Sequence, residues 1–170
     1  MFNLPEAYSV PFNKEAHHDA VQKLVRPNEV AHLFPYVSPA QALFLPPLAE
    51  RVAGWLKQKF ITGEFRYQLD PPAFDYWYSP AVTLRRRAGD CEDFTLLVVS
   101  MLVSQGVSAD VAIGSVWSGG SFGGHAWVEG ADAISGFLIE GTSGDLYRHT
   151  RPDEYRLMWK ITPNTVRRAA

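Results

Sequence analysis

Apolar residues recur at helical spacing in three stretches of the chain. Over residues 48–61 they lie three or four positions apart, which predicts an amphipathic helix that Gly63 would end. Residues 92–105 are apolar on every face, a pattern typical of a helix that is buried all round. A weaker repeat predicts another helix over residues 13–25.

The second half of the chain changes from helical spacing to alternation. Residues 109–117 alternate with Val111 and Ile113 on one face, which predicts a strand. Glycine-rich turns separate further predicted strands, and the run GGSFGG at residues 119–124 predicts a flexible loop. A helix followed by strands favours an α+β domain, in which the buried helix packs on an antiparallel β-sheet. The other predicted strands cover residues 125–129, 137–140 and 155–161.

Proline and glycine divide the chain into two parts. Ten of the twelve prolines lie in residues 1–80, and eleven of the thirteen glycines lie between residues 89 and 144. Because proline is excluded from helix interiors and central strands, the first part is expected to hold short helices and rigid turns. We therefore predict a proline-rich N-terminal arm over residues 1–45 and one domain over residues 46–165. The aromatic-rich residues 64–80 are expected to form a loop.

Composition and charge exclude several classes of protein. With 46% hydrophobic residues in 170, the chain can bury a full core, which excludes disorder as its main state. A net charge of −2 gives no basic field, so we expect no nucleic-acid partner. The longest apolar run, residues 96–103, is too short to span a membrane, so none is expected. The N-terminus does not resemble a secretory signal, which favours a cytoplasmic location.

The chain contains one cysteine, Cys91, which excludes an internal disulfide and a cysteine-rich zinc site. It lies in the first turn of the buried helix, where the partial positive charge of the helix end favours a thiolate. The neighbouring acids Asp90, Glu92 and Asp93 oppose this effect, since negative charge raises a thiol pKa. An inert core thiol is the alternative interpretation.

A histidine on a later strand gives this thiol a candidate partner. His125 opens the predicted strand after the glycine loop, and it can contact Cys91 in space whatever their separation in sequence. A carboxylate would orient the imidazole, and the candidates are Glu129, Asp132 and Glu140. We choose Glu140, because it ends the next strand and adjacent strands lie ~5 Å apart. The alternative for His125 is a hydrogen-bonded surface histidine.

Five segments together resemble the transglutaminase-like cysteine protease superfamily, and within it the bacterial transglutaminase-like cysteine proteinases. The resemblance implies a papain-like core with Cys91 as nucleophile and His125 as general base. The third residue is usually an aspartate in that family, and the matching position here is Glu140. The segments are FRYQLD (65–70), DYWYSP (75–80), TLRRRAGDCEDFTLL (83–97), GGHAWVE (123–129) and FLIEGTSG (137–144).

Two features near the thiol stay open at this point. The backbone N–H of Cys91 is a natural oxyanion donor, and Trp77 or Gln68 could supply a second one. Some proteases that resemble this chain bind calcium through acids of the cysteine motif, here Asp90 and Glu92. We favour helix capping for these acids, because three adjacent carboxylates do not supply the six to eight oxygens of a calcium site. No metal and no cofactor are expected.

The sequence therefore predicts a thiol-dependent hydrolase or acyl transferase acting on peptide or glutamine carboxamide bonds. The triad would be Cys91, His125 and Glu140, with a thioester intermediate and a protein or peptide as substrate. Peptidase activity is favoured, while transglutaminase or deamidase activity remains open. The alternative is a structural or assembly module, bacterial or encoded by a phage, that keeps the fold and uses residues 1–45 to dock a partner.

Overall fold

A computed structural model describes residues 7–9, 15–35, 37–71, 74–149 and 151–169. Within these residues the largest sheet is antiparallel and six-stranded, in the order β10-β9-β5-β6-β7-β8. This confirms the predicted α+β fold, and the predicted strand over residues 155–161 has the bounds of β9. The strands are β5 (Ser108–Ser118), β6 (Ser121–Ala131), β7 (Gly136–Ile139), β8 (Leu146–Arg148), β9 (Tyr155–Ile161) and β10 (Val166–Arg168).

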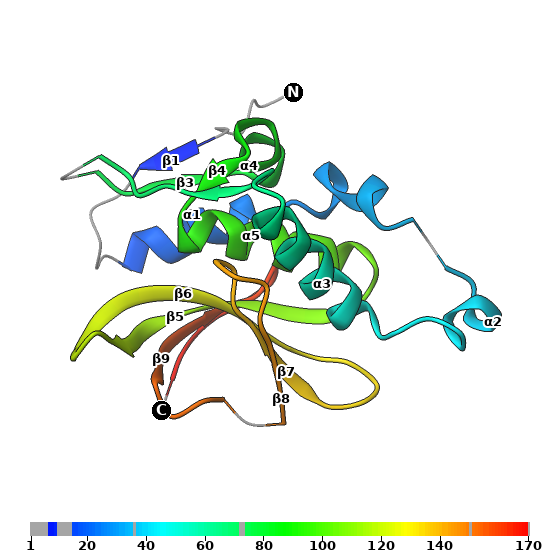
Figure 1. The fold of residues 1–170 in the computed structure, drawn as a ribbon. Coiled ribbons are helices and arrows are strands. Elements are labelled where there is room, and N and C mark those ends of the chain that lie inside the picture. The colour runs from blue at the N-terminus through cyan, green and yellow to red at the C-terminus, as the bar shows by residue number, and fades with distance from the viewer. Residues whose placement is uncertain (1–6, 10–14, 36, 72–73, 150, 170) are drawn as a thin grey trace.

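Three helices lie on one face of this sheet (Figure 1). They are α1 (Glu15–Leu24), α3 (Leu48–Ile61) and α5 (Cys91–Ser104). α5 packs against β5 and β6, and its side chains from Glu92 to Leu102 are all buried, as its uniformly apolar sequence predicts. α3 has the predicted bounds. The predicted helix over residues 13–25 is α1, although residues 13 and 14 lie outside the described residues.

The segment before α5 contains more regular structure than the sequence suggested. The predicted loop over residues 64–80 is partly wrong, because two short strands in it find partners elsewhere in the chain. The helix after it was not predicted, although Ser79 and Pro80 are typical of a helix start. These elements are β2 (Arg66–Tyr67) beside β4 (Ala88–Gly89), β3 (Tyr76–Tyr78) beside β1 (Ala7–Ser9), and α4 (Pro80–Arg86).

The predicted flexible loop at residues 119–124 is wrong. β5 and β6 pair from Ser108 with Ala131 to Ser118 with Ser121, which leaves only two residues to connect them. Those two, Gly119 and Gly120, have φ values of +59° and +90°, a conformation that glycine adopts without strain in two-residue hairpin turns. His125 therefore lies inside a long strand and not at its start.

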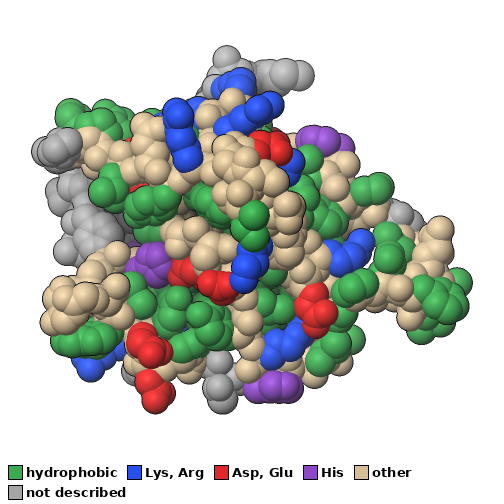
Figure 2. Space-filling view, in the orientation of Figure 1, with side chains coloured by type: hydrophobic (Ala, Val, Ile, Leu, Met, Phe, Trp, Pro, Cys, Tyr) green, Lys and Arg blue, Asp and Glu red, His purple; other side chains and the backbone are tan. Residues whose placement is uncertain are grey.

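The described part of the predicted arm packs on the same core as the rest of the molecule. Val21 and Leu24 of α1 are buried in the cluster that contains the α5 side chains. The four-residue helix α2 (Pro39–Ala42) differs, because Leu43 and Phe44 after it are 83% and 87% exposed. Hydrophobic side chains are accordingly visible over the α2 region in Figure 2. None of the described helices is long and apolar enough to cross a membrane.

Candidate active site

Cys91 is the first residue of α5 and is half-buried. The turn that leads into it needs Gly89, because a Cβ at this position would lie 2.4 Å from Oδ2 of Asp93. The sulfur accepts a hydrogen bond from the backbone N–H of Ala126 in β6, which favours the thiolate. The start of α5 therefore places the thiol directly against the strand that carries His125.

His125 contacts the carboxylate that the sequence predicted. Its Nε2 lies 2.8 Å from Oε2 of Glu140, which directly follows β7. β7 pairs Ile139 with Val128, and this register continued by one residue sets Glu140 opposite Trp127. His125 is two residues further along β6, so the extra methylene of glutamate helps to span the gap that the usual aspartate would leave.

Four hydrogen bonds fix the carboxylate of Glu140. Oε1 accepts from the backbone N–H and the hydroxyl of Thr142 at 3.0 and 2.8 Å. Oε2 accepts from the hydroxyl of Tyr155 at 2.8 Å, in addition to its contact with His125. Burial alone would raise the pKa of Glu140, but these hydrogen bonds and the charge of His125 outweigh burial and lower it. Tyr155 was not among the predicted site residues, since nothing in the strand pattern marks it.

Cys91 and His125 line one pocket of about 210 Å³. Of the two side chains considered as oxyanion donors, Trp77 lines this pocket, but its indole N–H also donates to Asp75 at 2.9 Å. Gln68 is exposed and is not part of the pocket lining. The rest of the lining combines apolar with acidic side chains: Tyr67, Leu69, Asp75, Asp90, Glu92, Ile113, Gly124 and Ala126.

The Asp90 side chain does not act as the expected helix cap, whereas the carboxylate of Asp93 in the first turn accepts a hydrogen bond from the backbone N–H of Asp90. Asp90 occupies the N-cap position, but its side chain makes no capping hydrogen bond, and its buried Oδ1 has no partner among the described residues. Burial raises the pKa of Asp90 to about 6. Oxygens of Asp70, Asp90 and Glu92 lie within 4.8 Å of one another. Oxygen is the ligand that calcium prefers, so these three residues could hold such an ion.

The local electrostatics oppose ionisation of the thiol. Sγ of Cys91 donates a hydrogen bond to Oε2 of Glu92 at 3.1 Å. Burial, and after it the negative charge of Glu92, raise the pKa of Cys91 well above its ordinary value. This differs from the expectation for a helix start, because adjacent carboxylates act at shorter range than the helix dipole.

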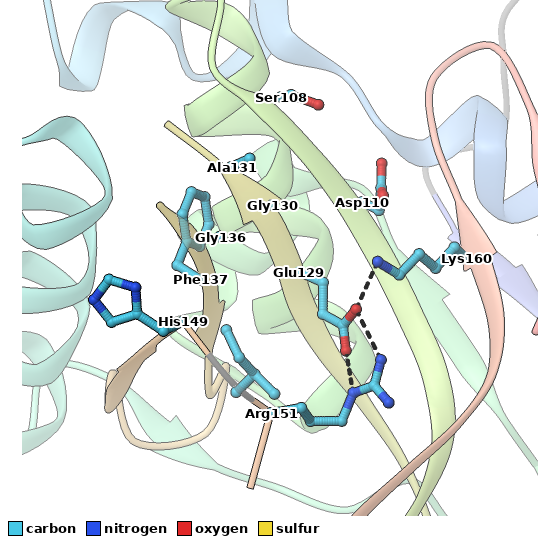
Figure 3. A pocket seen from close by; sticks show the side chains of 11 residues that line it. Ser108, Asp110, Glu129, Gly130, Ala131, Gly136, Phe137, His149, Arg151 and Lys160 are labelled. Carbon is cyan, nitrogen blue, oxygen red and sulfur yellow. Dashed lines mark hydrogen bonds and ion pairs between the residues drawn. The ribbon is translucent and has the colours of Figure 1, made fainter. Parts of the chain in front are cut away.

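The other two candidate carboxylates contact arginines instead of His125. Glu129 lies in a second pocket, of about 370 Å³, where its oxygens are 2.5 Å from Nε of Arg151 and 2.6 Å from Nζ of Lys160 (Figure 3). Asp132 pairs with Arg148 at 3.1 Å. Of the three carboxylates considered, Glu140 is the one hydrogen-bonded to His125.

One known protein is similar to part of this chain in sequence, and another is similar to it in fold. Over 84 residues the chain is 37% identical to the centrosomal protein of 76 kDa from Pongo abelii, a match that covers 47% of this chain but only 12% of that protein. LapG of Legionella pneumophila in its calcium-bound form shares the fold, with a TM-score of 0.59 and 17% identity over 89% of this chain and 87% of LapG. An EGTA-treated form of LapG matches with a TM-score of 0.58.

A family model matches the segment of the chain that carries two residues of the candidate site. The model of the transglutaminase-like superfamily matches residues 46–139, which begin just before α3 and end with the last residue of β7. This range is more than half of the chain and contains both Cys91 and His125. The chain therefore belongs to the transglutaminase-like superfamily.

Proposed function

We propose that this protein is a thiol peptidase in which Cys91 is the nucleophile, His125 the general base and Glu140 the residue that orients the imidazole. The observation that carries the proposal is the 2.8 Å hydrogen bond between Nε2 of His125 and Oε2 of Glu140, beside the pocket that Cys91 also lines. An imidazole held by a carboxylate and facing the same pocket as a thiol meets the requirements of nucleophilic catalysis.

Each residue has a defined task in the proposed reaction. Because Nε2 of His125 is engaged by Glu140, Nδ1 is left to accept the thiol proton. The thiolate of Cys91 then attacks the carbonyl carbon, and the backbone N–H of Cys91 stabilises the oxyanion. His125 returns the proton to the departing amine, which leaves a thioester. Water, deprotonated by His125, attacks the thioester and releases the carboxylic acid and the thiol.

The walls of the pocket favour a particular class of peptide. Leu69 and Ile113 present aliphatic side chains and Tyr67 an aromatic ring to the space beside Cys91. An apolar side chain next to the cleaved bond would bury its surface there. We favour water over a lysine amine as acceptor, because the sequence motifs resemble the proteinase branch of the superfamily.

Contrary to the expectation of no metal, we also propose that Asp70, Asp90 and Glu92 bind a calcium ion, with backbone carbonyls or waters supplying its remaining oxygen ligands. Three observations support this: the clustered carboxylate oxygens, the unpartnered Oδ1 of Asp90, and the calcium-bound form of LapG, which has a similar fold. A bound calcium ion would supply positive charge beside Cys91. Since the charges of Glu92 and Asp90 raise the pKa of the thiol, neutralising them would lower it.

Alkylation of Cys91 tests both proposals. The labelling rate of the native protein with iodoacetamide is measured from about pH 4 to about pH 10, in calcium chloride and in EGTA. With calcium, a catalytic pair gives fast labelling with a midpoint below the ~8.5 of a free thiol, whereas in EGTA the acids beside Cys91 keep the midpoint above that value. The substitution His125→Ala is expected to move the midpoint upward, and calcium to move it downward. Since Cys91 is the one cysteine of the sequence, every adduct reports on it.

A matched variant separates the calcium proposal from the peptidase proposal. Asp70 lies twenty residues before Asp90 and belongs to a different segment, so Asp70→Asn should abolish the response to calcium and keep the profile in EGTA. An unchanged calcium response in this variant would reject the ion site. Labelling that appears only after denaturation would show that Cys91 is an inert core thiol, and the peptidase proposal would fail.

The products identify the acceptor. A mixture of synthetic peptides with apolar side chains is incubated with the protein, with and without a fluorescent primary amine, and analysed by mass spectrometry. We expect cleaved peptides, and no cleavage by the Cys91→Ala variant. Incorporation of the amine without cleavage would mean that the protein is an acyl transferase and not a peptidase.

A further inference from the structure

Tyr155 reaches the candidate site from a strand that is not a neighbour of β6. It begins β9, which pairs with β5, and it lies opposite Val116 in that pairing. Its ring packs edge-to-face on Trp127 of β6, with ring centroids 5.2 Å apart. This packing directs the hydroxyl of Tyr155 toward Glu140, where it donates to Oε2 at 2.8 Å.

The oxygen that Tyr155 contacts is the one that contacts His125. Oε2 of Glu140 therefore contacts both His125 and Tyr155, and Oε1 accepts from the backbone N–H and the hydroxyl of Thr142. Glutamate has one more rotatable bond than aspartate, so its carboxylate needs more restraint to stay on the imidazole. Thr142 fixes one oxygen, and the hydroxyl of Tyr155 fixes the other at the position where it meets Nε2.

The phenol of Tyr155 remains a hydrogen-bond donor over the working range of the site. Burial, and after it the charge of Glu140, raise its pKa far above that of an ordinary tyrosine. The titratable and charged groups that interact with Glu140 are His125 from β6, Tyr155 from β9, Tyr147 from β8 and Tyr67 from β2. Asp145 and its partner Lys57 from α3 also act on Tyr147, and Cys91, Asp90 and Glu92 at the start of α5 also act on Tyr67.

We propose that Tyr155 is a positioning residue of the candidate active site: its hydroxyl holds the Glu140 carboxylate ionised and aimed at Nε2 of His125. This inference rests on the proposed function, because it assigns Tyr155 a task within the proposed triad. Tyr155 does not touch the reacting atoms and acts only through Glu140.

Titration of Glu140 by carboxyl ¹³C NMR tests the proposal. The signal is assigned with Glu140→Gln and followed in the wild type and in Tyr155→Phe. Phenylalanine keeps the ring on Trp127 but removes the hydroxyl, so one hydrogen bond to the charged carboxylate is lost. Such a bond changes an equilibrium by about tenfold, so the protonation constant of Glu140 should rise about tenfold in the variant.

Tyr147→Phe is the matched control. It removes the hydroxyl of the adjacent tyrosine, whose ring lies 6.5 Å from that of Tyr155, and the hydrogen bonds of the Glu140 carboxylate do not involve it. The titration of Glu140 should match the wild type in this variant. If Tyr155→Phe only lowers the melting temperature and leaves the titration unchanged, Tyr155 has a structural role and the proposal is overturned.

A double-variant comparison links the positioning to the thiol. At neutral pH and fixed calcium, Tyr155→Phe should slow the alkylation of Cys91, but it should have no further effect when Glu140→Gln is already present. An equal slowing in both backgrounds would show that Tyr155 does not act through Glu140.

If Tyr155→Phe fails to fold, 3-fluorotyrosine is incorporated in place of every tyrosine of the chain. The hydroxyl of 3-fluorotyrosine is a stronger hydrogen-bond donor, so the pKa of Glu140 should fall. An unchanged pKa of Glu140 would overturn the proposal.

Failure of the proposed function gives a different result. If His125→Ala and the wild type label alike, the triad is wrong and the role of Tyr155 falls with it. If these two differ as expected while Tyr155→Phe matches the wild type in both measurements, only the inference about Tyr155 is rejected.

Discussion

Glu129 in β6 and Glu140 directly after β7 are both buried glutamates, and their neighbours give them different chemistry. Glu140 faces His125, Thr142 and Tyr155, groups that are neutral or titratable. Glu129 instead faces the basic side chains of Arg151 and Lys160 and also accepts a hydrogen bond from the indole of Trp127 at 3.0 Å. A carboxylate beside a histidine can support proton transfer, whereas one between two cations serves stability.

The substitution Glu129→Gln should therefore destabilise the protein in a pH-dependent way. Burial raises the pKa of Glu129, but Arg151, Lys160 and Trp127 outweigh it and lower the pKa to about 2. Since ~4.3 is the value in an unfolded chain, the ion pairs contribute stability above about pH 4 and lose it as the pH falls toward 2. Urea unfolding should give a loss on the order of 3 kcal/mol at neutral pH.

Urea unfolding at several pH values tests whether the charge of Glu129 causes this loss of stability. The difference between wild type and Glu129→Gln should narrow between about pH 4 and about pH 2, where the wild-type carboxylate itself becomes protonated. A difference that stays constant over this interval would mean that the change in side-chain shape, and not the charge, is responsible.

Among the elements, those with a long repeat were predicted well and the short ones were not. α3 has the predicted bounds, and α5 starts and ends one residue earlier than predicted, because fourteen residues show the helical period several times. β8 and β10 have three residues each, too few to show an alternation. The glycine run before His125 predicted a loop because residue type alone does not show that only two of its residues turn.

Gly114 supplies a prediction for the long hairpin of β5 and β6. A Cβ at Gly114 would lie 2.0 Å from the carbonyl oxygen of Arg156 in β9 and 2.8 Å from the indole of Trp127. Gly114→Ala must therefore push β9 or Trp127 aside, and we expect a loss of about 1–3 kcal/mol in the free energy of unfolding. Chemical denaturation measures it.

Gly123 in β6 is the control for this substitution. A Cβ there meets nothing within 4 Å, so Gly123→Ala should change stability by less than about 0.5 kcal/mol. Equal losses in the two variants would point to a general cost of replacing glycine in this hairpin. They would contradict the specific contact of Gly114 with its neighbours.

At the scale of the whole molecule, the segment predicted as an arm contains one part that is buried in the core and one part that is exposed. Leu24 in α1 is 2% exposed and belongs to the main core, so Leu24→Ala should cost about 2–5 kcal/mol. Leu43 is 83% exposed, and Leu43→Ala should change stability by less than about 0.5 kcal/mol. Thermal unfolding of both variants compares them. Similar melting temperatures would mean that α1 contributes little to the stability of the core.

The candidate site combines residues that a motif can reveal with residues that only the fold brings together. Cys91 and His125 lie in recognisable segments, and Glu140 followed from the order of the strands. Tyr155 lies in a segment without a chemical pattern, and Asp70 lies in the FRYQLD segment, whose sequence did not mark it as a site residue. Tyr155 enters the site because β9 pairs with β5, and Asp70 because the fold brings its carboxylate close to those of Asp90 and Glu92. Their contributions could not be predicted from spacing along the chain.

The strand order also determines when a newly synthesised chain could assemble the proposed site. β9 lies between β5 and β10, so the strand that carries Tyr155 is made after β5, β6, β7 and β8 but docks beside the first of them. Such non-local pairing is slow to form and waits for the ribosome to release the later residues. The nascent chain thus holds Cys91, His125 and Glu140 before Tyr155 can contact Glu140, so under the proposed function the site is complete only once the sheet has formed.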